Sequence, residues 1–160
     1  MPELTPSKLA SASRVEMTQL VLPSYANAMG NAFGGRVMQW IDLAAAMAAM
    51  RHARMAVVTA SIDQLSFHAP IRVGQMAILR ARLNAVFGSS MAIEVTVDAE
   101  DPRSGERMLC CDAFLTFVAL GPDGRPAPAP LLLSETEEEA QRAREAEARR
   151  AVRLARRQRA

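Results

Sequence analysis

The stretch RVMQWIDLAAAMAAMRHA, residues 36–53, decides the fold. Ala, Met, Leu and Gln dominate it, and these residues favour an α-helix. Its polar exceptions before the basic end are Arg36, Gln39 and Asp42. A helix that is apolar nearly all round is normally buried on most sides. The stretch therefore predicts a central helix that begins at Gly34 or Gly35 and is enclosed by the rest of the domain.

Apolar and polar residues alternate along much of the remaining chain, which is the period of a half-buried strand. The candidate strands are residues 15–22, 57–67, 79–87, 91–97 and 109–117. The turn sequences GSS (88–90) and DPRSG (101–105) join the later runs, which indicates an antiparallel meander with one apolar face. The apolar face of such a sheet and the apolar surface of the helix can each be removed from water by packing against the other. We therefore predict an α+β fold in which a long curved sheet wraps around the helix.

Composition divides the 160 residues into four segments. We expect a flexible N-terminus over 1–14, the folded domain over 15–121, a proline-stiffened linker over 122–133 and a charged helix over 134–160. Ser134, with a glutamate three residues on, has the pattern of a capping box.

The end of this last helix carries six arginines and no acid in residues 148–160. Such a segment can grip nucleic acid or an anionic membrane. It lacks interleaved aromatic residues and a bulky apolar face. We therefore favour a solvated arm whose acidic start meets a neighbour's basic end, and we expect no nucleic-acid or membrane partner.

Several function classes lack their usual marks. The net charge is only +2, and the two histidines and two cysteines show no zinc-ligand spacing, so we predict no metal site. Phosphate-binding glycine loops and a G-x-S-x-G elbow are missing. Cys110 and Cys111 are adjacent, cannot bridge each other and are expected to pack. We expect His52 to cap its helix and His68 to be a packed or surface residue. Without a signal peptide or membrane span, the expected location is the cytoplasm.

Asp42 is the most informative residue. Its neighbours one helical turn away on either side include no cation, so it has no ion-pair partner on its own helix. A carboxylate on a mostly buried helix is costly unless it is paired, hydrogen-bonded or used. A structural aspartate and a catalytic one remain equally open from position alone.

The approach to the helix is the second candidate feature. Gly34 and Gly35 let another group come close to the backbone, and the first amides of a helix lack internal acceptors. These amides can hold a developing oxyanion such as a polarised carbonyl oxygen. Asn31 adds a side-chain donor four residues upstream of Gly35. A plain turn and cap is the structural alternative.

The run NAMGNAFGGRVMQWID (27–42), followed by VVTASIDQLSFHAPIRVGQ (57–75) and SSMAIEVTVDAED (89–101), resembles the hotdog-fold acyl-CoA thioesterases. It is most similar to the cytosolic acyl-CoA hydrolase branch, and the resemblance covers about residues 20–139. It implies a sheet wrapped around a central helix and hydrolysis of acyl-CoA to coenzyme A and a carboxylic acid. No cofactor is implied, because coenzyme A is part of the substrate.

In tandem members of this branch one domain supplies a catalytic Asn and the other an Asp, and their motif positions correspond to Asn31 and Asp42. The resemblance thus implies a single-domain version that self-associates, as a dimer and then a hexamer. Amides near Gly35, with Asn31, would hold the thioester oxygen. Asp42 of the partner chain would act as general base or attack directly to give an anhydride. Thr59 would orient water or Asp42, or be an ordinary strand residue.

Separation along the helix also favours a shared site. Asp42 lies seven residues beyond Gly35, roughly 10 Å along a helix axis. A base and an oxyanion donor should each lie within about 3 Å of the reacting groups. One helix cannot easily supply both, whereas two antiparallel copies can, giving two identical sites.

Coenzyme A carries phosphates, so basic and amide-rich surfaces should flank the site. The substrate-binding candidates are Gly34, Thr59, Arg72, Ser89 and Ser90, with solvated turn residues as the alternative for the last three. Departures from the family pattern at Tyr25, Leu43 and Gln75 bear on substrate preference. Two other functions remain open: a different acyl-CoA enzyme such as a hydratase, and a non-catalytic acyl-CoA sensor.

Overall fold

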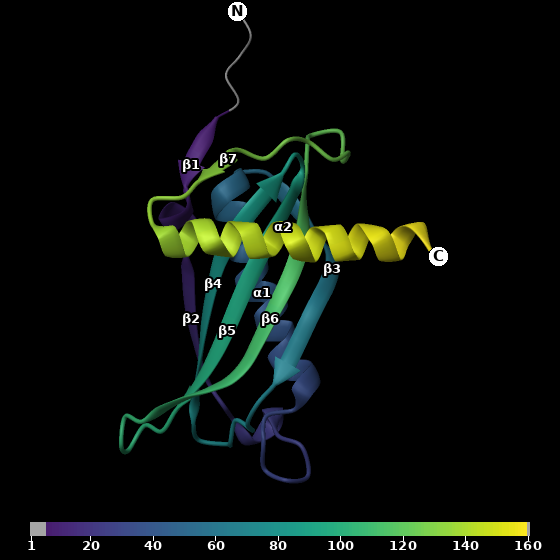
Figure 1. The fold of residues 1–160 in the computed structure, drawn as a ribbon. Helices are drawn as coiled ribbons and strands as arrows, with labels where there is room; N and C mark the ends of the chain where they lie inside the picture. The colour runs from purple at the N-terminus through teal and green to yellow at the C-terminus, as the bar shows by residue number, and fades with distance from the viewer. Residues whose placement is uncertain (1–5, 160) are drawn as a thin grey trace, which may run out of the picture.

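The computed structural model describes residues 6–159, which form one sheet, two long helices and a small strand pair (Figure 1). In chain order the elements are β1 (Ser7–Leu9), η1 (Ala10–Ser13), β2 (Val15–Leu20), η2 (Pro23–Tyr25), α1 (Gly34–Ala53), β3 (Ala56–Phe67), β4 (Met76–Phe87), β5 (Ser90–Glu100), β6 (Arg107–Leu120), β7 (Leu131–Leu133) and α2 (Glu137–Gln158). Neither long helix combines the length and apolar character needed to cross a membrane.

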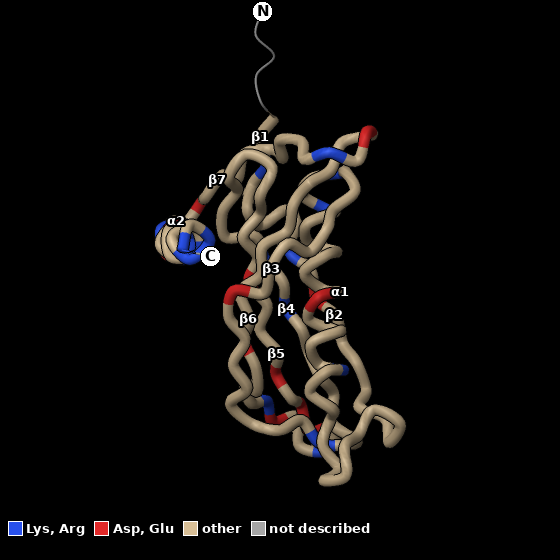
Figure 2. Tube along the Cα trace, turned by 90° about the vertical axis from the view of Figure 1, so that its right-hand side faces the viewer, with Lys and Arg blue, Asp and Glu red and all other residues tan. Residues whose placement is uncertain are grey.

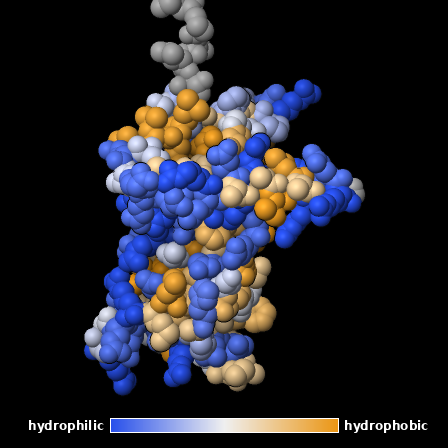
Figure 3. All heavy atoms as spheres, viewed as in Figure 1, coloured by the Kyte–Doolittle hydropathy of each residue, from blue (hydrophilic) through white to orange (hydrophobic). Residues whose placement is uncertain are grey.

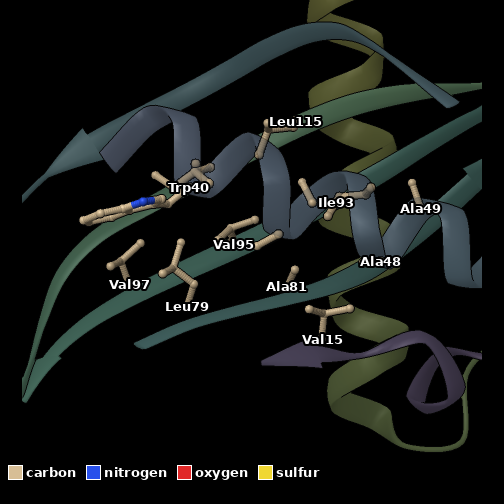
Figure 4. Packing of buried hydrophobic residues seen from close by; sticks show 14 of the residues in the cluster. Val15, Trp40, Ala48, Ala49, Leu79, Ala81, Ile93, Val95, Val97 and Leu115 are labelled. Atoms are coloured by element: carbon tan, nitrogen blue, oxygen red, sulfur yellow. The ribbon is translucent and has the colours of Figure 1, made fainter. Parts of the chain in front are cut away.

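The five-stranded antiparallel sheet has the order β2-β4-β5-β6-β3 and wraps around α1, which confirms the predicted α+β fold (Figure 1). Each predicted strand is present, with boundaries shifted by a few residues. Figure 4 shows the reason for the close fit between the layers: Trp40, Ala48 and Ala49 of α1 face aliphatic side chains of the sheet. The small alanine side chains bring the helix backbone near the sheet, and Trp40 lies buried in the same core cluster.

β3 is one of the two edge strands of this sheet, β2 being the other, and its Thr59 contacts the candidate carboxylate of Asp42. It pairs with β6 on one side, and its register shifts between Thr59 and Ser61 and again between Ile62 and Gln64. Its other edge has no strand partner within residues 6–159. Exposed edge strands of this length are templates for pairing with another chain.

The N-terminal and linker segments differ from the expected flexible lead-in and simple linker. Ser7–Leu9 pairs in parallel with Leu131–Leu133, so part of each segment forms a two-stranded strap. Lys8 Nζ donates to the carbonyl oxygen of His52 at 2.6 Å, which ties the strap to the end of α1. These two strands form through pairing between residues far apart in the sequence. Each is too short to show the alternation of apolar and polar residues from which a strand is predicted. Residues 1–5 of the predicted N-terminus lie outside the described part.

The C-terminal helix begins later than predicted and is not a solvated arm. Thr136, rather than Ser134, is the N-cap, and its Oγ1 accepts a hydrogen bond from the Glu139 amide at 3.1 Å. The helix crosses the outer face of the sheet, as Figures 1 and 2 show. There the Arg149 guanidinium lies 3.7 Å from the centroid of the Phe114 ring. The arginine stems cover aromatic side chains of the sheet, a role that sequence charge alone does not reveal.

His52 is buried and does not cap α1, contrary to the prediction. Arg54 closes the helix in a left-handed conformation with φ of 53°, donating its amide to the Met50 carbonyl. The Nε2 atom of His52 lies 2.7 Å from the carbonyl oxygen of Pro130. Its Nδ1 atom is buried without a hydrogen-bond partner among the described residues. Burial lowers the pKa of His52, because the protonated ring would have to be accommodated in the interior.

Candidate active site

The loop that leads into α1 is built around the side chain of Asn27. Its Oδ1 accepts hydrogen bonds from the amides of Met29, at 2.9 Å, and Asn31, at 3.2 Å. The Asn27 amide donates to the Asn31 carbonyl at 2.8 Å, and Gly30 turns the chain with φ of 77°. With the oxygen of its side chain occupied, Asn27 keeps an exposed Nδ2 that can donate to a ligand. Sequence reasoning missed this residue.

The N-terminus of α1 offers backbone donors. Phe33 is the N-cap and provides no side-chain hydrogen bond. The amides of Gly34 and Gly35 have no acceptor within residues 6–159, as expected for the first turn of a helix. A Cβ on Gly35 would lie 2.9 Å from the Phe33 ring, so only glycine lets this ring fold over the helix start. The geometry fits the predicted oxyanion site.

Asp42 accepts a hydrogen bond from the neighbouring edge strand β3. The Thr59 hydroxyl donates to Asp42 Oδ1 at 2.7 Å, joining the middle of α1 to β3. Asp42 makes no ion pair within the described part of the chain. A carboxylate with one oxygen fixed and the other unpaired is suited to accept a proton or to attack a carbonyl. Among the roles left open for Thr59, this hydrogen bond supports orientation of Asp42.

The other predicted site residues divide between the two ends of the sheet. Arg72 forms an isolated bridge with Asn31, so it lies beside the loop before α1. Ser89 and Ser90 lie beyond the far end of β4, about 36 Å from its start in an extended strand. A single chain therefore brings Arg72, but neither serine, to the glycine end of α1.

A hollow of about 420 Å³ adjoins the start of α1. It is lined by Ser24, Tyr25, Ala26, Phe33, Gly35, Arg36 and Gln39. The Arg36 guanidinium stands 4.6 Å above the centre of the Tyr25 ring and donates to Gln39 Oε1 at 3.0 Å. These two contacts hold the cation next to the candidate oxyanion site. Tyr25 had been noted only as a family departure and Arg36 only as a polar exception in the helix.

The remaining nucleophile and metal-ligand candidates lie outside this arrangement. Cys110 and Cys111 are buried, as predicted, and burial raises the pKa of Cys111 to about 12. A protonated thiol is a poor nucleophile. His68 is a surface residue that contacts Asp112 Oδ2 at 3.0 Å. Over the described residues, no three His, Cys, Asp or Glu side chains form a group suited to a metal ion.

Comparison with protein families finds a match to the thioesterase superfamily over residues 29–106. A protein of Bacillus subtilis, named as an uncharacterized acyl-CoA thioester hydrolase, is 39% identical over 137 residues, covering 86% of this chain and 80% of the relative. The cytosolic acyl coenzyme A thioester hydrolase of Mus musculus is 38% identical over 152 residues. The chain spans 40% of the length of that mouse protein.

Solved structures with similar folds include an apo, hexameric acyl-CoA thioesterase, with a TM-score of 0.91 and 40% identity, covering 94% of this chain and 97% of the other. An acyl-CoA hydrolase of Staphylococcus aureus, solved with butyryl coenzyme A, coenzyme A and coenzyme A disulfide, gives a TM-score of 0.89 at 35% identity, with 95% and 93% coverage. Variants of that enzyme with alanine in place of an aspartate, an asparagine or a threonine have also been solved.

Proposed function

The chain belongs to the thioesterase superfamily and has its hotdog fold, and from this premise we propose that it hydrolyses acyl-CoA to coenzyme A and a carboxylic acid. The observation that carries the proposal is the placement of Asp42. This carboxylate belongs to the helix whose first amides have no acceptor among residues 6–159, and Thr59 of β3 orients it. Relatives over most of the chain are named as thioester hydrolases. Neither the hydratase nor the sensor alternative gains comparable support.

The residue numbers of the Staphylococcus aureus variants support a specific catalytic set. In that enzyme the substituted asparagine precedes the aspartate by 15 positions, and the threonine follows it by 17. The same spacings in this chain select Asn27, Asp42 and Thr59. We propose Asn27 Nδ2 as the side-chain donor to the thioester oxygen. Asn31, the donor predicted from the sequence, remains the second candidate in the same loop.

The reaction needs a polarised carbonyl and an activated water. Donors at Gly34, Gly35 and Asn27 stabilise the negative charge that develops on the thioester oxygen. Asp42 takes a proton from water as the water oxygen bonds to the carbonyl carbon. The carbon–sulfur bond then breaks, and the proton passes to the departing thiolate. In the anhydride route, Asp42 attacks first and water cleaves the acyl-aspartate. The attack of Asp42 expels the coenzyme A thiolate, and if water then attacks the Asp42 carbonyl carbon, a single turnover in ¹⁸O-labelled water places the label on Asp42, which the general-base route never does.

We propose that each site is shared between two copies paired along β3. Val58 and Ile62 leave apolar side chains exposed on this edge, 45% and 42% respectively. Pairing two identical edges about a two-fold axis makes the partner's α1 antiparallel to this one. The partner's glycines then approach Asp42, which overcomes the separation of roughly 10 Å within one helix. The hexameric relative supports further assembly into a trimer of dimers.

The same two-fold arrangement assigns the remaining predicted residues. Ser89 and Ser90 of one copy lie at the end of the sheet that faces the partner's loop. We propose that they join Arg72 of that partner, and the fixed Arg36, in flanking the phosphates of coenzyme A. The cytosolic mouse relative supports a cytoplasmic location.

A panel of acyl-CoA esters, assayed for release of free thiol, tests the function. Wild-type protein should release coenzyme A, and Asp42→Asn should lower turnover about 10²–10⁴-fold. Asp112→Asn is the matched control, because this carboxylate contacts His68 and lies outside the candidate site. Comparable turnover in the wild type and Asp42→Asn would remove Asp42 from the chemistry. Absence of thiol release with every ester would overturn the proposed function.

A further inference from the structure

The last turns of α2 continue past the edge of the sheet on which the helix lies. Arg149 covers Phe114 of β6, and one turn later Arg153 Nε lies 3.8 Å from Asp63 Oδ1 of β3. Because β3 is the last strand on this side of the sheet, no further strand among residues 6–159 lies along the path of the helix after Arg153. Figure 1 shows this C-terminal end extending beyond β3. Five residues remain to Gln158, about 8 Å of helix and more than one strand spacing.

On one face of this end of α2, an apolar side chain and two arginines lack packing or ion-pair partners among the described residues. A groove of about 540 Å³ runs between α2 and β3, lined by Asp63, Gln64, Ala148, Arg149, Val152, Arg153, Arg156 and Arg157. Val152 is 55% exposed in it. Arg156 and Arg157 make no ion pair within residues 6–159. Figure 3 shows apolar atoms among the hydrophilic side chains toward this end of the helix.

The outer face of β3 carries a matching apolar residue. Val58 lies opposite Val118 in the register with β6, and Thr116 of β6 binds Asp63 below α2. Val118 and Thr116 are two residues apart, so they share one face of the sheet. Val58 therefore faces the same side as α2, and it is 45% exposed.

Two-fold pairing of the β3 edges brings these features together. With the two twelve-residue strands fully overlapped, the first half of one strand lies beside the second half of the other. The overhang after Arg153 then lies over the partner's first half, which includes Val58. Each α2 helix passes over its own β3 near Asp63. In the paired strands the two Asp63 positions are about three strand residues apart, so the two helices lie about 10 Å from each other. That separation is close to the ordinary distance between packed helices.

We infer that the overhang of α2 after Arg153 forms a clasp over β3 of a second copy of this chain, with Val152, at the edge of this chain's own β3, packed toward the partner's Val58. The clasp rests on the dimer proposed above and extends its interface from the strand edge to the outer face of the sheet. Asp63 of the second copy provides a carboxylate for Arg156 and Arg157, which make no ion pair within residues 6–159 of one chain.

Dissociation of the dimer tests the clasp. Val152→Arg places charge and bulk under the overhang, and Ala151→Arg places the same group on the opposite side of α2, outside the groove lining. Sedimentation over a dilution series of the full chain should give a dimer Kd at least about tenfold weaker for Val152→Arg, with the control unchanged. Thermal unfolding of each variant checks that both remain folded.

Cross-linking gives a positional readout that does not depend on dimer strength. A Val152→Cys chain mixed with a Val58→Cys chain should be joined by a short bismaleimide, whereas Ala151→Cys with Val58→Cys should not. The native cysteines are buried and leave little background.

The failures of the clasp and of the proposed dimer are distinct. A wild-type protein that is monomeric at all concentrations would overturn both. A stable, active dimer with equal Kd values for the two arginine variants and no cross-link would overturn the clasp alone. Inorganic phosphate that protects the groove arginines from modification, with dimer strength unaffected by Val152→Arg, would also overturn it.

Discussion

Asn27 and Asn31 occupy one loop but have different chemical freedom. The side-chain oxygen of Asn27 is used to shape the loop, which leaves its Nδ2 as a donor of fixed direction. Sequence reasoning selected Asn31 because it lies near the glycines, although the loop geometry was not visible in the pattern. The sequence did contain a signal for Asn27. An asparagine at the start of a turn often accepts hydrogen bonds from backbone amides a few residues later, as Asn27 does here from residues 29 and 31.

Substitution separates the two asparagines. Asn27→Asp keeps an oxygen to accept from the Met29 and Asn31 amides but removes the donor and adds negative charge at the oxyanion. We expect its kcat to fall about 10²–10³-fold. Asn31→Asp should change kcat much less, because the backbone of that residue, rather than its side chain, closes the loop. Initial rates with a saturating acyl-CoA ester give the comparison. The opposite order of kcat values would return the donor role to Asn31.

His52 couples stability to pH. The ring is neutral in the folded protein, since burial lowers its pKa below the usual value near 6.5. The unfolded chain therefore binds a proton first as the pH falls. Stability is fully present above the unfolded pKa and decreases below about pH 6.5. His52→Gln retains a donor for the Pro130 carbonyl but does not titrate. Urea unfolding at pH 7.5 and 5.5 should show a smaller decrease for this variant, and equal decreases would contradict the assignment.

At the scale of elements, period and propensity were enough for α1 and the five long strands. Each carries its own signal, such as Met91, Ile93, Val95 and Val97 on one face of β5. β1 and β7 are three residues each and pair across more than 120 positions, so their pattern was too short to detect. The sequence did not predict that α2 packs on the sheet, for another reason. The helix packs through arginine side chains that lie over aromatic rings of the sheet, whereas a run of charged residues predicts exposure to solvent.

The start of α2 supplies a test at this scale. Thr136→Ala removes the oxygen that accepts from the Glu139 amide, and loss of such a cap costs about 1 kcal/mol. Ser134→Ala changes the residue that the sequence pattern favoured and should have little effect. Free energies of unfolding from denaturant titration distinguish the two. A larger loss at Ser134 would restore the capping box predicted from the sequence.

For the molecule as a whole, the unpaired edge of β3 and the position of Asp42 point in the same direction. Thr59 belongs to that edge strand, so the candidate base stands where a second copy would pair. The sequence already indicated a shared site, because seven residues of helix separate Asp42 from Gly35. The sequence gave no indication that β3 is an edge strand, since strand order depends on pairing across the whole chain.

Mixed dimers provide the direct test of the shared site. One chain carries Asn27→Asp and the other Asp42→Asn, and each homodimer has two broken sites. If a site combines Asn27 of one copy with Asp42 of the other, a mixed dimer has one doubly broken site and one intact site. Random pairing makes half of the dimers mixed, so about a quarter of all sites should recover wild-type turnover.

The opposite arrangement gives a different number. If Asn27 and Asp42 act within one chain, every site in a mixed dimer retains one defect, and the mixture shows only the residual rates of the single variants. The two chains should be co-expressed with different affinity tags, so that mixed dimers are purified and their composition is verified before assay. If the site is shared between copies, purified mixed dimers should recover about half of the wild-type rate per dimer, since one of their two sites is intact. Activity confined to the residual level in those dimers would exclude a site shared across β3 while leaving thioester hydrolysis itself in place.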